Sequence, residues 1–165
     1  MKKHKNIIGT LIFAAVVIFC LAKAMDVHQF TMLKNQVNDY ETRMYDIATE
    51  VEMNLEEMDV VGLNNNKDEL NVLLEEIEVT AEEYDEDSTE RKMFNEFTAS
   101  IEYLIQSVDI MIAVVDDPWS MLSGVPEQQL ATIEKEIEEH ATLYEQYKME
   151  LKLLDDIAEI EGQDL

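Results

Sequence analysis

The sequence has little that breaks a helix or crosslinks a chain. It contains 4 glycines, 2 prolines and 1 cysteine in 165 residues. A turn-rich β-sandwich, a collagen-like repeat and a glycine-rich nucleotide loop all need more glycine or proline than this. A lone cysteine, Cys20, excludes a disulfide within the chain. Side-chain packing alone must therefore hold the fold together.

Basic residues are also few, because 12 Lys and Arg stand against 37 Asp and Glu, giving a formal charge of -25. Four of the basic residues precede Ala24 and every acid follows it. The part beyond Ala24 therefore carries eight basic residues, 37 acids and a formal charge of -29. Such a charge repels phosphate backbones and anionic lipid headgroups. We expect no nucleic-acid partner, whereas a basic protein partner fits the charge.

The residue types that carry catalysis are scarce. Beyond Ala24 the chain has two histidines, His28 and His140, no cysteine, and no serine in a recognisable nucleophile elbow. We therefore expect neither enzymatic activity nor a cofactor. A metal or haem carrier using His140 is an alternative function, but Ile137 occupies the position where a ferritin-like Glu-x-x-His motif needs glutamate.

The N-terminus has the features of an export signal. Three lysines among the first five residues precede residues 7–22, a run of sixteen positions with nothing more polar than Thr10. The positive-inside rule keeps the basic end in the cytoplasm and places the residues after Lys23 outside. The sequence thus predicts a single-pass protein of the bacterial cytoplasmic membrane, inserted through residues 7–22.

The sequence allows two fates for this leader, retention as an anchor or cleavage. No glycine or proline lies between Gly9 and Gly62, so the apolar helix can continue into the next segment, which favours an uncleaved signal anchor over residues 1–24. The alternative is cleavage at Ala24, because Ala22-Lys23-Ala24 fits a signal-peptidase pattern. Cleavage would give a secreted or periplasmic protein.

Beyond the leader, apolar residues recur at intervals of 3 and 4, the spacing of one helix face. The first stripe predicts a helix over about Met25 to Val61, roughly 55 Å long. The run from Gly62 to Asn66 is predicted to end this helix and reverse the chain. The stripe comprises Phe30, Leu33, Val37, Tyr40, Met44, Ile47, Val51, Leu55 and Met58.

Three further stretches repeat the spacing. Between Glu82 and Lys92 the pattern lapses, and Asp87 with Glu90 fits a capping box, which predicts a helix boundary there. Pro126 suits the first turn of the last helix. The stripes are Leu70, Leu73, Leu74, Ile77, Ala81 and Tyr84; Phe94, Phe97, Ile101, Leu104, Val108, Met111 and Val115; and Leu130, Ile133, Ile137, Ala141, Tyr144, Lys148, Leu151, Leu154 and Ala158.

These patterns predict an all-α fold in which the N-terminal helix precedes an antiparallel four-helix bundle. The acidic bundle is expected over residues 25–161, with a tail at residues 162–165. The alternative is three long, coiled-coil-like helices, which would result if one helix continued through residues 82–92.

A lysine-rich end, one apolar span and a heptad-patterned helix leading into a four-helix bundle resemble the periplasmic ligand-binding module of bacterial chemoreceptors. The likeness concerns layout from Met1 to about Glu161 and includes no shared motif. It implies a ligand-binding sensor module. The chain has no second apolar run of this kind and no cytoplasmic signalling part, so transmembrane signalling is not implied.

Two local features are candidate sites. A cluster of carboxylates between the second and third predicted helices could attract divalent cations loosely, or could be a solvated polar face. The connection before the last helix contains apolar residues that are costly to expose together, so it either caps the end of the bundle or anchors a protein partner. The carboxylates are Glu82, Glu83, Asp85, Glu86 and Asp87, and the apolar residues are Trp119, Met121, Leu122 and Val125.

The sequence is most consistent with a non-enzymatic, membrane-anchored protein that mediates protein-protein interaction in the cell envelope. A homo-oligomer is also expected, because a continuous stripe on a long helix can serve a second copy as readily as an intrachain core. The ligand-binding sensor module and the metal or haem carrier are the alternative functions.

Overall fold

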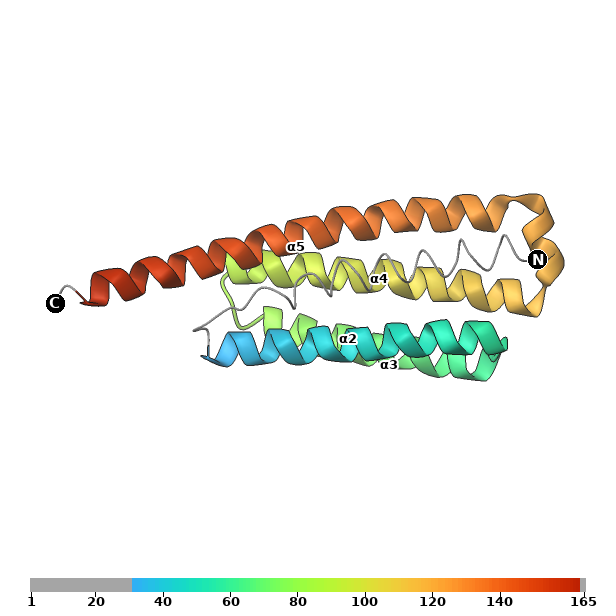
Figure 1. The fold of residues 1–165 in the computed structure, drawn as a ribbon, viewed down its shortest axis with the longest axis horizontal. Helices are drawn as coiled ribbons and strands as arrows, with labels where there is room; N and C mark the ends of the chain where they lie inside the picture. The colour runs from blue at the N-terminus through green and yellow to red at the C-terminus, as the bar shows by residue number, and fades with distance from the viewer. Residues whose placement is uncertain (1–30, 164–165) are drawn as a thin grey trace.

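A computed structural model describes residues 31–163 of the chain (Figure 1). The predicted leader, its cleavage site and His28 lie outside the described residues. The described part is helical and contains no strand, so the all-α prediction is confirmed. Its elements are α2 (Thr31–Glu57), α3 (Val60–Ala81), α4 (Thr89–Asp116), the short 3-10 helix η1 (Pro118–Ser123) and α5 (Val125–Gln163).

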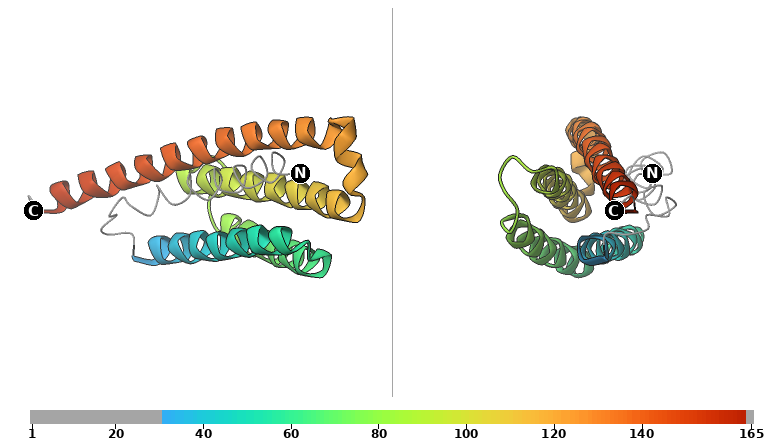
Figure 2. Two further views of the ribbon diagram at one scale, coloured as in Figure 1. Left: turned by 45° about the vertical axis from the view of Figure 1, so that its right-hand side comes forward. Right: turned by 90° about the vertical axis from the view of Figure 1, so that its left-hand side faces the viewer.

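Consecutive helices run antiparallel and pack side by side. α3 packs against both α2 and α4, and α4 makes its most extensive contact with α5. The α2–α3 turn and η1 lie at one end of the molecule, whereas α5 continues past the other helices at the opposite end (Figures 1 and 2). We call the end with η1 the tip. α2 and α5 have no pair of Cα atoms within 8 Å of each other.

The predicted stripes supply the core. On α2 the stripe residues from Val37 to Val51 are buried by the chain's own helices. Aromatic rings meet at the centre, where Phe97 of α4 lies 5.0 Å from Tyr144 of α5 between ring centroids. Other fully buried side chains are Met44, Leu63, Leu70, Leu73, Ile77, Met93, Phe94, Ile101 and Leu104.

The chain reverses between α2 and α3 earlier than predicted. The turn is at Met58 and Asp59, where the Asp59 side chain accepts a hydrogen bond from the Val61 amide at 3.0 Å and caps α3. The predicted reversal over Gly62 to Asn66 is wrong, since these residues form the first turns of α3. Buried Asn66 instead bonds across to α2, accepting from Asn54 Nδ2 at 2.6 Å.

The predicted break between Glu82 and Lys92 is present, so the alternative of three long helices is wrong. The N-cap of α4 is one residue later than predicted. Ser88, not Asp87, has the extended backbone of an N-cap, and its Oγ accepts from the Arg91 amide at 3.1 Å. Both residue types cap helices well, so composition alone does not decide between neighbours.

Among the described residues, α4 is the one helix long and apolar enough to cross a membrane by length and composition. Its apolar faces are used within the molecule, because it packs against both α3 and α5. Its exposed positions are few: Lys92, Asn95, Glu102, Gln106, Asp109, Ala113 and Asp116. The apolar character of α4 is therefore accounted for by its two neighbours.

Gly62 allows α2 and α3 to approach closely, and this gives a test of the turn. A Cβ at Gly62 would lie 2.5 Å from Asn54 Cγ, so Gly62→Ala must displace the side chain that bonds Asn66. The lost Asn54–Asn66 hydrogen bond and the steric overlap with Asn54 together cost about 2 kcal/mol, and the higher helix propensity of alanine returns about 1 kcal/mol. We therefore expect a net destabilisation of about 1 kcal/mol.

The control is the same change in an Asn54→Ala background, measured by urea unfolding. With the Asn54 side chain gone, Gly62→Ala should become neutral or stabilising. Equal destabilisation in both backgrounds would contradict this account of the turn.

Candidate functional site

Large apolar side chains are exposed at the tip, although most of the surface is acidic. Trp119 and Leu122 are each 78% exposed, and Val61 is 70% exposed. The five residues that we call the tip residues come from two connections at the same end of the molecule (Figure 1). They are Met58, Val61, Trp119, Leu122 and Val125.

Local hydrogen bonds hold η1 in the conformation that exposes Trp119. Asp117 Oδ1 accepts from the Trp119 amide at 3.2 Å, and Pro118 begins the 3-10 helix. Gly124 ends it with φ 70°, a left-handed conformation that favours glycine. Of the two alternatives for this segment, the cap over the helix ends does not describe Trp119, Leu122 and Val125, which are exposed. Met121 is partly buried.

The turn at the end of α2 adds an apolar side chain at a conformational cost. Met58 has φ 56°, and it is the one non-glycine residue with positive φ in the described part of the chain. Glycine adopts this conformation without the steric cost of a side chain, about 1 kcal/mol. Sequence reasoning assigned Met58 to the core stripe, but the helix ends at Glu57 and leaves Met58 half exposed.

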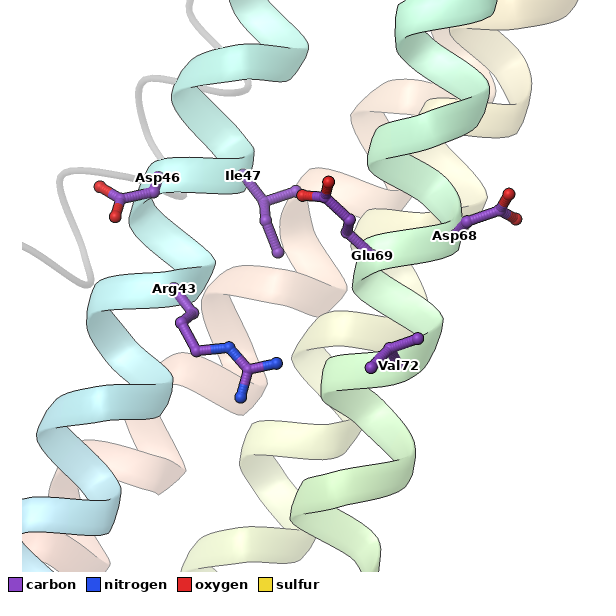
Figure 3. A pocket seen from close by; sticks show the side chains of 6 residues that line it. All are labelled: Arg43, Asp46, Ile47, Asp68, Glu69 and Val72. Atoms are coloured by element: carbon purple, nitrogen blue, oxygen red, sulfur yellow. The ribbon is translucent and has the colours of Figure 1, made fainter.

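Two hollows lie between neighbouring helices. One, of about 430 Å³, separates α2 from α3 and is lined by Arg43, Asp46, Ile47, Asp68, Glu69 and Val72 (Figure 3). Its carboxylates do not converge, since Asp46 points away from the two acids of α3 in Figure 3. The Arg43 guanidinium is already bonded to Glu76, which raises the pKa of Arg43 and lowers that of Glu76.

The second hollow, of about 510 Å³, is a groove between α4 and α5. Ile110 and Ile133 give it an apolar floor, and Val125 lies at its tip end. It therefore adjoins the tip surface, and the two share Val125.

The predicted carboxylate cluster lies in the α3–α4 connection, away from the tip (Figure 1). All five side chains are exposed. Within residues 31–163 no group of three or more His, Cys, Asp or Glu is arranged to hold a metal ion. The residues concerned are Glu82, Glu83, Asp85, Glu86 and Asp87.

His140 lies on the α4–α5 contact. Its Nδ1 is 2.6 Å from Glu96 Oε2, and its ring stacks on Tyr103 at 5.6 Å between centroids. One contact is made by a ring nitrogen and the other by the face of the ring. They leave it fixed by a carboxylate and an aromatic ring of α4.

A polar cluster, missed by sequence reasoning, bridges α2 and α5 where their backbones stay apart. Glu41 is only 2% exposed, and its Oε1 accepts from Tyr144 at 2.8 Å and from Lys148 at 2.6 Å. Its Oε2 and the Oε1 of Glu145 are buried without a hydrogen-bond partner in the chain. The signal in the sequence was Lys148, a cation within an apolar stripe, because a buried cation needs an acidic partner. Glu41 of α2 is that partner.

Burial controls the titration of this cluster. It raises the pKa of Tyr144 well above the usual value, with Glu41 adding to the effect. It also raises the pKa of Glu145, against the opposing effect of Lys148. The cluster thus contains a buried acid paired with donors and a second acid that is costly to ionise.

Comparison of the chain with protein-family models, with curated proteins and with solved structures finds no match. Its function is therefore argued from its own geometry.

The raised pKa of Glu145 gives a test with a definite sign. Above the folded-state pKa of Glu145, the folded protein holds a poorly solvated carboxylate, which costs stability. As pH falls toward 4.5, Glu145 is protonated in the folded protein before it is protonated in the unfolded chain, so this cost disappears. Glu145→Gln should therefore stabilise the protein near neutral pH by about 0.5 kcal/mol, a small value because Glu145 is partly exposed and solvent screens its charge.

This gain should shrink as pH falls toward 4.5, the ordinary carboxyl pKa. Thermal melts across that range measure it, with Glu139→Gln as the control, because Glu139 is exposed on the same helix. If both variants gained equally at every pH, reduced overall repulsion would explain the result and the buried cluster would not.

Proposed function

We propose that the chain is a non-enzymatic, membrane-anchored protein that binds another protein in the cell envelope through its tip. In this proposal the four helices act as an antiparallel bundle outside the cytoplasm, and residues 7–22 anchor it to the bacterial cytoplasmic membrane. The observation that carries it is the exposure of Trp119 and Leu122, each 78%, at the end of an acidic molecule.

Three physical features support this use of the tip. Tryptophan and flanking apolar residues are enriched in the energetic centres of protein interfaces. Trp119, Leu122 and Val125 are exposed apolar residues within one short segment of the chain, and such clusters usually mark an interaction site. Met58 keeps an apolar side chain at a position where glycine would cost less, and such local strain gathers at functional positions.

Self-association would need a different surface from the one expected. The α2 stripe from Val37 to Val51 is occupied within the chain. Exposed apolar side chains in the C-terminal half of α5 remain for a second copy, namely Met149, Leu153 and Leu154.

The test uses the full chain in its own membrane. A photoactivatable amino acid at Val61 should form an adduct with a second protein, and Trp119→Ser with Leu122→Ser should reduce that adduct roughly tenfold or more, since a hot-spot side chain contributes about 2 kcal/mol. Both residues are exposed, so folding should be unaffected.

The matched control is Val72→Ser with Val79→Ser, two exposed valines on α3. It should leave the adduct unchanged. An adduct insensitive to the tip substitutions, or no adduct at all, would refute binding through the tip.

A further inference from the structure

The groove between α4 and α5 has a volume of about 510 Å³. Residues of α4 form one wall and residues of α5 the other. The walls include Gln106 and Ile110 on α4 and Val125, Gln129, Ile133 and Glu136 on α5.

The floor of this groove is apolar, and Ile110 connects it to the main core. Ile133 and Ile137 form a small buried cluster of their own, with Tyr103 and Ile110 partly buried against them. Apolar side chains at the bottom of an open groove favour an occupant that brings apolar side chains of its own.

The length of the groove indicates the size of that occupant. Along α5 it runs from Val125 to Glu136, twelve residues or about 17 Å. A helix laid alongside would cover it with about three turns, using apolar residues at i, i+3 or i+4, and i+7. At its upper end, half-exposed Val125 joins the groove to Trp119 and Leu122 of the tip.

The residues that line the groove include two acids, Asp109 and Glu136, and no Lys or Arg. No Lys or Arg occurs between Lys92 and Lys135, a stretch that forms nearly all of α4, the whole of η1 and the start of α5. Lys67 of α3 is paired with Asp109 at 2.5 Å, and Lys135 of α5 directly precedes Glu136. The acids of the stretch are Glu96, Glu102, Asp109, Asp116, Asp117, Glu127 and Glu134.

This charge excludes a second copy as the natural occupant. The chain beyond Ala24 carries a formal charge of -29, so two copies repel each other at this face. An occupant that supplies Lys or Arg gains attraction along the groove and faster association.

We propose that the α4/α5 groove binds a basic amphipathic helix, about three turns long, from a partner protein. The inference rests on the proposed function and adds the chemistry of the partner. The apolar stripe of that helix packs on Ile110 and Ile133, its cations face the acids of α4 and α5, and the exposed amides of Gln106 and Gln129 bond its polar side chains.

The experiment places a photoactivatable amino acid at Gln129 in the full chain in cells and maps the crosslinked segment of the adduct by mass spectrometry. The control position is Val79, which is exposed on α3. We expect an adduct at Gln129 only, joined to a segment with helical apolar spacing and an excess of Lys and Arg.

A synthetic peptide of the mapped segment is then titrated into the purified full chain. Adding a cation in the groove, Gln106→Arg with Gln129→Arg, should weaken binding roughly tenfold, whereas Val72→Arg with Val79→Arg adds the same charge elsewhere and should weaken it far less. Both pairs are exposed, so a fold defect does not explain a difference.

The remaining outcomes separate the two proposals. Crosslinks from the tip position Val61 without any from Gln129 would overturn the groove site and leave the proposed function intact. A mapped segment that is acidic, non-helical or part of a second copy would also overturn it. Absence of adducts at both positions would reject the groove and the proposed function together.

Discussion

The burial of α4 between α3 and α5 is the contact on which the rest of the structure depends. No disulfide crosslinks the chain and its charge opposes compaction, so buried apolar area must supply the stabilising free energy. α4 contributes Phe94 and Phe97, both fully buried, and each such side chain adds about 1.5–3 kcal/mol. Phe97 packs on Tyr144 of α5. Phe94 packs on Tyr40 of α2 and on Tyr84 of the α3–α4 connection. α2 joins this centre mainly through α3.

That arrangement explains why α2 and α5 are bridged by polar side chains. Their backbones stay apart, and long side chains span the distance, with Glu41 accepting from Tyr144 and Lys148. A buried ion pair adds little net stability because desolvation offsets the attraction, but a shift of either helix would leave a charge buried alone. The cluster therefore fixes the relative position of the two helices more than it stabilises them.

Helix periodicity predicted most of the fold, because the core positions of long helices repeat at a fixed interval. Most positions of the two predicted stripes, the one through Val37 on α2 and the one through Ile101 on α4, are buried as expected. The roles of short polar residues were predicted less well, because asparagine occurs both in turns and in hydrogen bonds between helices. Asn66 was predicted in a turn but bonds Asn54 of the neighbouring helix. The local sequence pattern does not predict which apolar side chains are exposed either. Trp119 could equally have covered the helix ends, and the hydrogen bonds of η1 turn it outward instead.

The exposed tip and the adjoining groove, whose lining contains no Lys or Arg, are the surface that we propose for a basic, partly apolar partner. The most direct measurement is quenching of tryptophan fluorescence in the purified full chain, because Trp119 is the single tryptophan. An exposed Trp119 among acids predicts emission like that of indole in water, strong quenching by acrylamide, and stronger quenching by caesium than by iodide. Blue-shifted emission that acrylamide fails to quench would place Trp119 inside the molecule and contradict the account.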